Sequence, residues 1–452
     1  MRSSASGLID RARPDDVLHL AVDRGRVPMA IGALLVLEPD RRPRADVVRD
    51  TLLHRAAGVP RLGQRLATTP PGAGRPVWLD AGSDVLADLV DGVVVPTSGT
   101  AEPGGTSRVL LDATADLVMH RLTPERPLWR ARLLLDSEGG VLGIGIVAHH
   151  VLADGMGGLA VLGALADGGP AGPVRPAERR PEARPPWLDL ARDAWTGRLL
   201  GVRTPGRAVR RVGGGLDELG LRRPHGAERC SLLAPSSGRR RLAVCQVELA
   251  GTLATARTRG ATVNDLVVTA VTGALVRLLE HRGEHVRELV VSVPVSRRRQ
   301  GDAASLGNAT GVVPVRVPAV VDAQERLTSL LQQQARVRSR GRGGSAAVLT
   351  PVFRTLAAVG AFQAFIDHQH LVHTFVTNLR GPTERLKFAG SPVAAVVPVA
   401  VNPGNVTLSF DVLSYAGTLG ITVVADPVRV PETDWFRDVL EEELRAVVGA
   451  GG

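Results

Sequence analysis

The pattern of hydrophobic and polar positions in the first third of the chain predicts a mixture of strands and helices. Apolar residues at helical spacing within residues 44–66 predict one helix, and the small-residue stretch 156–166 predicts another. Short apolar runs predict strands at residues 29–38, 108–111, 130–135 and 141–148. These elements indicate an α/β unit that ends near Ala166.

The second half of the chain has a comparable order of elements, without a residue-level repeat. Its apolar runs predict strands at residues 241–249, 286–295, 311–317, 372–377, 393–401, 406–413 and 419–425. Helices are expected from about Asn264, at residues 323–337 and at residues 434–447. With 452 residues, the chain is too long for one ordinary core. We therefore expect an α/β fold of two domains.

The composition changes between the two halves. Residues 167–240 are rich in Gly, Pro and Arg, and the first part of this range has no regular period. This range is expected to be a linker and crossover that is partly helical. The predicted domains are therefore residues 1–166 and residues 241–452.

Composition narrows the class of protein. Aromatic residues make up 3% of the chain, so the cores must be built from Val, Leu and Ala. Cys230 and Cys245 show neither metal-ligand spacing nor a disulfide framework, so no metal is expected and a reducing cytoplasm is the simplest setting. No signal peptide or membrane-spanning stretch is predicted.

The charge balance is basic. The net charge is +10, and Lys387 is the only lysine. This excess of arginine suits contact with an anionic membrane or lipid-droplet surface, or with the phosphates of a nucleotide-like ligand. A GC-rich genome explains the same excess equally well. Nucleic acid is not an expected partner, because the basic residues are dispersed and few aromatics are present for base stacking.

A histidine pair at the end of a predicted strand is the strongest candidate for catalysis. His149 and His150 begin the sequence HHVLADG, directly after the apolar run 141–148. An imidazole can accept a proton from a hydroxyl near neutral pH, so we assign His150 as the general base and His149 as its supporting neighbour. A packed structural histidine is the alternative. Asp154 suits a helix N-cap, and Gly155 permits a tight approach of the backbone.

Other segments are candidates for substrate contact. Pro127, Leu128 and Trp129 form a rigid apolar wall or a piece of core. Thr262 and Asp265 match a capping box, next to Asn264, which could donate a hydrogen bond into a cleft. The segments containing Ser305, Asn308 and Asn378 look like polar turns. Three arginines at residues 297–299 could meet phosphates or face solvent.

Several enzyme classes lose support because their motifs are absent. The sequence contains no GxSxG nucleophile elbow, no P-loop, no HExxH and no dinucleotide fingerprint. Hydrolase, kinase, metalloprotease and dehydrogenase functions are therefore not indicated. A direct group transfer assisted by a histidine requires none of these motifs.

Taken together, the motifs resemble the wax ester synthase/diacylglycerol acyltransferase family. They occur in the family's order as LHLAVDRGRVPMAIGALLVLEP, PLW, HHVLADG, SGRRRLAV, ATVNDLVV, SLGN, TNLRGP and LSYAGTLGITVVAD. The resemblance covers nearly the whole chain. It implies two chloramphenicol acetyltransferase-like domains with an active-site tunnel between them, and acyl transfer from acyl-CoA, as co-substrate, to diacylglycerol or a long-chain alcohol, with no bound cofactor.

The resemblance also implies roles for individual residues. His150 is implied as the general base, with His149 also important for activity and Asp154 holding the loop through an arginine. Asn264 is implied to position substrate or stabilise the oxyanion, and Asp265 to support the local architecture. Where many relatives carry a small apolar pair, this chain has Leu-Arg after Asn378, which is expected to alter acceptor choice.

Three alternatives remain open at this point. The same machinery could act on another hydroxyl or an amine of a specialised lipid or natural product. The chain could instead be a non-catalytic lipid-binding protein. The weakly polar stretch 352–365 could contact a membrane peripherally, although an ordinary packed helix is the preferred interpretation.

Overall fold

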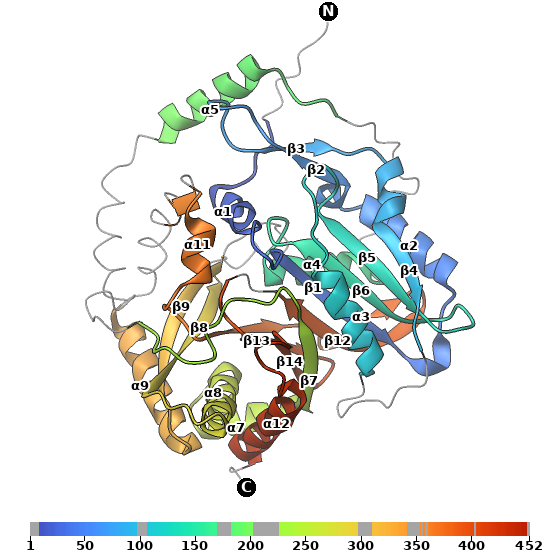
Figure 1. Cartoon of the computed structure of the whole chain (residues 1–452). Coiled ribbons are helices and arrows are strands. Elements are labelled where there is room, and N and C mark those ends of the chain that lie inside the picture. The colour runs from blue at the N-terminus through green and yellow to red at the C-terminus, as the bar shows by residue number, and fades with distance from the viewer. Residues whose placement is uncertain are drawn as a thin grey trace, which may run out of the picture.

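In the part of the chain that the structure describes, two six-stranded mixed β-sheets are surrounded by helices (Figure 1). The computed structural model describes residues 9–96, 106–169, 182–201, 226–296, 310–340, 353, 356–357, 360–401 and 404–449. Within these ranges, the first sheet has the order β11-β12-β1-β6-β5-β4, and the second has the order β7-β14-β13-β10-β8-β9. The expected α/β fold is confirmed.

In Figure 1 the first sheet lies to the right of the second sheet and slightly above it. Its strands are β1 (Ala30–Leu37), β4 (Val90–Val94), β5 (Trp129–Leu135), β6 (Val141–His149), β11 (Lys387–Phe388) and β12 (Ser391–Ala400). Beside it, β2 (Gln64–Ala67) and β3 (Val77–Asp80) form a two-stranded sheet. The helices of this half are α1 (Pro14–Val22), α2 (Ala45–Ala57), α3 (Arg108–Val118), α4 (Gly155–Leu165) and α5 (Trp187–Gly201). The described residues of this half also form the 3₁₀ helices η1 (Pro39–Arg41), η2 (Pro60–Gly63) and η3 (Asp84–Leu89).

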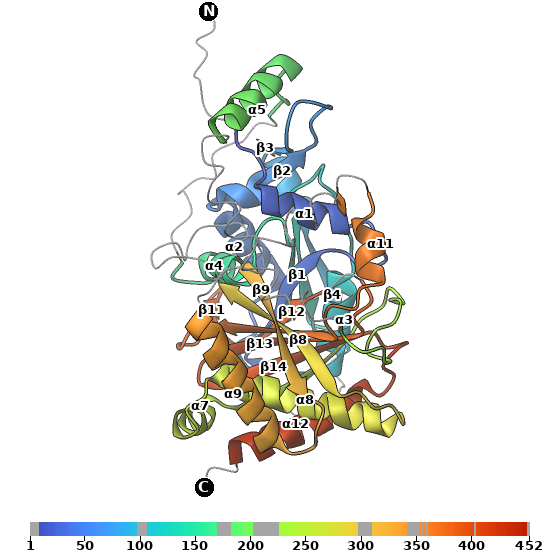
Figure 2. The same cartoon turned by 90° about the vertical axis from the view of Figure 1, so that its left-hand side faces the viewer.

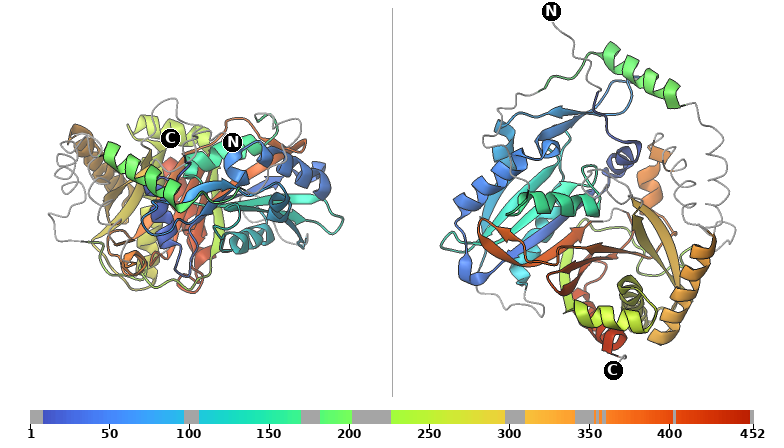
Figure 3. Two further views of the ribbon diagram at one scale, coloured as in Figure 1. Left: turned by 90° about the horizontal axis from the view of Figure 1, so that it is seen from above. Right: turned by 180° about the vertical axis from the view of Figure 1, so that it is seen from behind.

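The second sheet and its helices occupy the lower half, as the view from behind also shows (Figure 3). Its strands are β7 (Arg241–Glu248), β8 (Glu288–Ser296), β9 (Thr310–Pro318), β10 (Thr374–Arg380), β13 (Leu408–Tyr415) and β14 (Thr418–Ala425). Its helices are α7 (Leu249–Thr258), α8 (Val263–His281), α9 (Ala323–Arg340), α11 (Phe362–Asp367) and α12 (Thr433–Gly449). Helices α8 and α12 pack against each other on the outer side of the sheet, and α11 reaches up to α1 (Figure 2).

Strand β12 connects the two halves. It comes from the range expected to be the second domain, yet it pairs with β1 in the first sheet, from Ile31 opposite Ala400 onward. Its hairpin with β11 is held by Asp167 after α4, whose carboxylate accepts the backbone N–H of Gly390 at 2.7 Å. The sheets therefore do not follow the division into residues 1–166 and 241–452, because strand pairing joins segments that are distant in sequence.

Most predicted elements are confirmed, but three predictions were wrong. Residues 108–111 begin helix α3 instead of forming a strand, because apolar side chains continue at helical spacing to Val118. The helix predicted for residues 44–66 ends at Ala57, since Gly58 and Pro60 follow. The segment at Asn378 is no turn, because parallel pairing with β13 extends β10 to Arg380.

The described helices were compared with the length and composition that a membrane-spanning helix requires. Within the described ranges, no single helix has the length and apolar character needed to cross a membrane. Helices α7 and α8 reach that length and apolar character only when they are taken together, and their axes are bent by 98° relative to each other. The part of stretch 352–365 that the structure describes includes Phe362, which is buried in a cluster with Phe353 and Phe365.

A buried carboxyl group lies where the two sheets meet. Asp411 of β13 is only 3% exposed, and its Oδ2 accepts the backbone N–H of Ala400, at the end of β12, at 2.6 Å. Thr377, beside it on β10, donates a second hydrogen bond to the carboxyl group. Burial raises the pKa of Asp411 to about 7, and the two hydrogen bonds oppose this shift only in part.

We expect Asp411→Asn to change how stability depends on pH. The unfolded carboxyl ionises near pH 4, whereas the folded one ionises near pH 7, so wild-type stability should fall as pH rises between these values. Asn cannot ionise, so the variant should unfold at a higher urea concentration than wild type at pH 8, with little difference at pH 4.5. A variant that is less stable than wild type at pH 8 would contradict this account.

A buried ion pair ties α9 to α12 across α8. Arg326 is fully buried, and its Nη2 lies 2.6 Å from Glu443 Oε2. The same guanidinium donates to the carbonyls of Thr269 and Val320. Gly273 of α8 faces this pair so closely that an added Cβ would collide with both charged groups. The glycine therefore creates the space that the ion pair fills.

Gly273→Ala should lower the free energy of unfolding by about 1–3 kcal/mol, because the buried pair must be displaced. Gly251→Ala in α7 is the matched control. The nearest heavy atom to a Cβ at Gly251 is a Glu248 carboxylate oxygen at 3.6 Å, so this variant should gain roughly 0.5–1 kcal/mol from helix propensity. Urea unfolding monitored by circular dichroism measures both, and equal effects of the two substitutions would contradict the interpretation.

Candidate active site

The histidine pair lies where β6 turns toward α4. His149 is the last residue of β6 and pairs with Ala30 of β1. Its backbone N–H donates to the carbonyl of Leu128 at 2.9 Å, and the backbone N–H of His150 donates to the carbonyl of Met29 at 2.9 Å. The backbone of the pair is therefore bonded to the chain segments that precede both neighbouring strands, β5 and β1.

The ring of His149 is buried and its tautomer is fixed. Its Nδ1 accepts the backbone N–H of Val151 at 3.0 Å, so Nε2 carries the proton of the neutral ring. Nε2 lies 3.5 Å from Asp23 Oδ2. With 2% exposure, His149 cannot meet a substrate directly, and its ring instead holds the turn that carries His150.

Asp23 is itself held in place by other groups. Its Oδ1 accepts the backbone N–H of Met29 at 2.9 Å and an N–H of Arg121 Nη1 at 2.6 Å. Nη2 of the same arginine donates to the carbonyl of Gly25 at 2.5 Å. These bonds connect the segment after α1 to the loop after α3 and orient the carboxylate toward His149.

His150 is partly exposed, in contrast to His149. Its ring stacks on the ring of His19 from α1, with centroids 4.3 Å apart and an angle of 12° between the planes. Desolvation lowers the pKa of His19 well below the usual histidine value, and the nearby His150 and His149 lower it further. His19 is therefore neutral near pH 7 and presents an uncharged ring face to His150.

Asp154 and Gly155 form the start of α4. Asp154 is buried, and its Oδ1 accepts the backbone N–H of Gly157 at 2.9 Å, which confirms the predicted N-cap. A Cβ at Gly155 would lie 2.9 Å from Leu379 Cδ1, so a side chain there would force Leu379 to move. The end of β10, from the second half, thus contacts the histidine loop. The arginine partner expected for Asp154 stays a prediction.

Pro127, Leu128 and Trp129 pack beneath this loop. All three are buried, and Trp129 Nε1 donates to the carbonyl of Leu62 at 2.7 Å. The motif thus belongs to the core of the first half and supports His149 through the Leu128 carbonyl. A direct contact of these residues with substrate stays a prediction.

Asn264 and Asp265 lie at the start of α8. The capping box is confirmed: Thr262 Oγ1 accepts the backbone N–H of Asp265 at 3.2 Å, and Asp265 Oδ2 accepts that of Thr262 at 2.8 Å. Gln334 donates to the other carboxylate oxygen, so Asp265 serves the local architecture. Asn264 Oδ1 is buried without a hydrogen-bond partner among the described residues.

The structure does not join every candidate into one site. Helix α8 packs on α7, α9 and α12, whereas α4 packs on α2 and β1, so the substrate-positioning role of Asn264 stays a prediction. Asn378 lies on β10, next to the leucine that contacts Gly155, and Arg380 is exposed. Ser305, Asn308 and the arginines at residues 297–299 lie outside the described residues.

Sequence reasoning missed His19, Asp23 and Arg121. A signal was present, because His19 and Asp23 are four residues apart, the spacing that places two side chains on one helical face. Arg121 follows α3 and carries no comparable pattern. Its contact with Asp23 spans 98 residues, so only the fold brings the two together.

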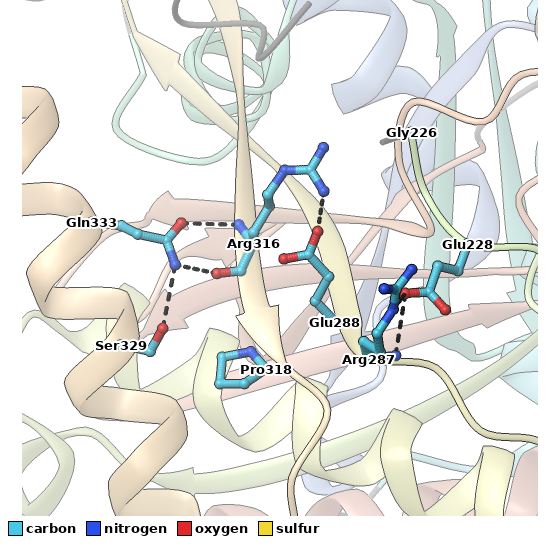
Figure 4. Close-up of a pocket in the computed structure, with 8 residues that line it drawn as sticks. All are labelled: Gly226, Glu228, Arg287, Glu288, Arg316, Pro318, Ser329 and Gln333. Carbon is cyan, nitrogen blue, oxygen red and sulfur yellow. Dashed lines mark hydrogen bonds and ion pairs between the residues drawn. The ribbon is translucent and has the colours of Figure 1, made fainter. Parts of the chain in front are cut away.

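A surface cavity in the second half does not belong to this site. It measures about 420 Å³ and lies between β8, β9 and α9 (Figure 4). Two arginines line it, but Arg316 is paired with Glu288, and Arg287 with Glu228. Since each cation already faces a carboxylate, the cavity has no unbalanced positive charge for an anion. Among the described residues, no cluster of His, Cys, Asp and Glu could hold a metal ion.

Solved structures with the same fold include a wax ester synthase/diacylglycerol acyltransferase and a condensation domain. The wax ester synthase/diacylglycerol acyltransferase from Marinobacter aquaeolei matches with a TM-score of 0.66 and 23% identity, over 97% of this chain and 100% of that one. The first condensation domain of the calcium-dependent antibiotic synthetase matches with a TM-score of 0.60 and 18% identity, over 96% of each chain. These likenesses confirm the fold.

Sequence comparison identifies the family. The probable diacylglycerol O-acyltransferase tgs1 of Mycobacterium tuberculosis is 28% identical over 94% of this chain and 92% of its own length. The probable diacylglycerol O-acyltransferase tgs2 of that organism is 26% identical, over 98% of this chain and 100% of its own length. The wax ester synthase/diacylglycerol acyltransferase catalytic domain matches residues 13–267, and the WS/DGAT C-terminal domain matches residues 306–447. Because the catalytic domain covers more than half of the sequence, this chain belongs to the wax ester synthase/diacylglycerol acyltransferase family.

Proposed function

We propose that this protein transfers a fatty acyl group from acyl-CoA to the hydroxyl of diacylglycerol, or of a long-chain alcohol, with His150 as the general base. The observation that carries this proposal is the contrast within the histidine pair. His149 is buried, accepts the backbone N–H of Val151 and faces Asp23 at 3.5 Å, whereas His150 is partly exposed on the same turn. A base must be both accessible and well oriented, and His150 meets both requirements.

The chemistry requires a single proton carrier. His150 removes the hydroxyl proton as the oxygen attacks the thioester carbonyl, and a carbon–oxygen bond forms. The carbon–sulfur bond then breaks, and the imidazolium returns the proton to the departing CoA thiolate, which leaves as a thiol. Proton transfer of this kind contributes about 10² to 10⁴ in rate. The reaction consumes no cofactor, and acyl-CoA is a co-substrate.

Comparison with relatives supports the choice of substrates. The relatives in Mycobacterium tuberculosis are named diacylglycerol O-acyltransferases, and one structural neighbour, the starter condensation domain of rhizomide synthetase, is in complex with C8-CoA. In this chain Leu379 occupies the space over Gly155 and Arg380 is exposed nearby. The Leu-Arg pair therefore places an aliphatic group, and not the charge, against the histidine loop.

His150→Ala should lower kcat/KM for acyl transfer by about 10² to 10⁴, because the hydroxyl proton loses its acceptor. The assay measures thiol release from palmitoyl-CoA with diacylglycerol, with hexadecanol and without acceptor, together with the lipid product. His54→Ala, an exposed histidine on α2, is the matched control and should retain activity. Full turnover in the His150 variant would refute its role as base.

The same assay separates the alternative functions. Turnover only with another hydroxyl or an amine would indicate a specialised acceptor and the same chemistry. Binding of palmitoyl-CoA without any thiol release, at every acceptor tested, would indicate a lipid-binding protein.

We also propose that helix α5 contacts an anionic lipid surface peripherally. One side of α5 is docked, since Leu190 is fully buried and Asp193 pairs with Arg11 at 2.5 Å. The helix also exposes Trp187 at 49%, although its Nε1 donates to the carbonyl of Pro71 at 3.4 Å, and Trp195 at 57%. Tryptophan favours the boundary between lipid and water, and the chain's net charge of +10 adds attraction to anionic headgroups.

Replacing both Trp187 and Trp195 by Ser should reduce cosedimentation with phosphatidylglycerol vesicles several-fold. Trp435→Ser is the matched control, because Trp435 is 37% exposed on α12, in the other half of the protein. High salt should weaken binding of the wild-type protein. Undiminished binding of the double variant would rule out α5 as the contact.

A further inference from the structure

Helix α1 supplies one side chain to each member of the histidine pair. His19 stacks on the ring of His150, and Asp23, directly after the helix, lies 3.5 Å from Nε2 of His149. The two residues are four positions apart, as expected for neighbours on one helical face. Neither lies in the HHxxxDG segment, and α1 is distant from β6 in sequence, so this arrangement is a property of the fold.

We propose that His19 is a positioning residue for the acyl transfer, and that its stacked ring orients His150 and stabilises the imidazolium formed when His150 takes the acceptor's proton. This inference rests on the proposed function and assigns a specific task to α1. His19 touches the base and not the substrate.

The stack favours the charged form of His150 over the neutral form. A cation over an aromatic face is attracted when it lies within about 6 Å of the ring centroid. The two centroids here are 4.3 Å apart and the rings are nearly parallel. Since His150 is charged only after it has accepted the proton, the attraction is larger in the transition state than in the ground state, which is the condition for catalysis.

His19 must remain neutral for this to work, and its surroundings keep it so. Desolvation, with His150 and His149 nearby, holds the pKa of His19 well below its ordinary value. Asp23, directly after α1, is engaged by Arg121. Asp367, on the neighbouring helix α11, accepts a hydrogen bond from Gln363 at 3.0 Å. Among the described residues, His150 and His149 are the charged groups that shift the pKa of His19, and both lower it.

The segment is anchored well enough to hold a ring in place. Asp16 accepts the backbone N–H of Arg13 at 3.0 Å at the start of α1. At its end, Asp23 is bonded to Met29 and Arg121. With both ends fixed, the ring of His19 is constrained relative to the turn that carries His150.

Two substitutions of His19 separate stacking from other roles. His19→Ala removes the ring, and kcat for acyl transfer should fall by about 10-fold to 100-fold with little change in KM. His19→Phe keeps an aromatic face without a titratable group, and it should restore most of the lost rate. His281→Ala is the matched control, because His281 also stacks on an aromatic ring, Trp435, with centroids 4.7 Å apart, far from this site.

Histidine NMR provides a readout that does not depend on turnover. The Hε1 resonance of His150, assigned with His150→Gln, should show a ring-current shift in wild type and in His19→Phe, and should lose it in His19→Ala. The Hε1 resonance of His19 should not titrate between pH 6 and pH 8. Thermal unfolding of each variant checks that the fold is retained.

Four results would overturn the inference: wild-type kcat in His19→Ala, equal defects in the Ala and Phe variants, an unshifted His150 resonance, or a titrating His19. A wild-type protein without acyl transfer would instead contradict the proposed function. In that case the Hε1 resonances of His150 and His19 still test whether the two rings stack.

Discussion

The pairing of β12 with β1 is the interaction on which the rest of the structure depends. β1 lies between β12 and β6, so one strand is bonded to a segment from the second half on one side and to the histidine strand on the other. Ala30 pairs with His149, and its neighbour Ile31 pairs with Ala400. Loss of this pairing would remove the support of the histidine turn and expose two strand edges.

The two histidines show how one short segment carries two different tasks. His149 completes the strand, accepts a backbone hydrogen bond and faces a carboxylate, so its ring is part of the scaffold. His150 has one ring face against the ring of His19 and is partly exposed. His149 ends strand β6, whereas His150 lies in the turn that follows, so the two side chains have different surroundings. The buried member limits the freedom of the exposed one.

Sequence patterns revealed most strands and helices because those signals are local. The β6 run, the α8 capping box and the N-cap at Asp154 all depend on residues within a few positions of each other. The placement of β12 in the first sheet and the contact between Arg121 and Asp23 depend on long-range pairing, which leaves no periodic trace. Residues 108–111 were misassigned because four residues are too few to distinguish the two periods.

The contact between Leu379 and Gly155 links the histidine turn to the second sheet. The leucine belongs to a strand of the lower sheet, whereas the glycine opens the helix that follows the histidines. Because no side chain separates them, any shift of the lower sheet toward the loop presses directly on backbone. The position of β10 and the path of the chain just after the histidines are therefore coupled through this contact.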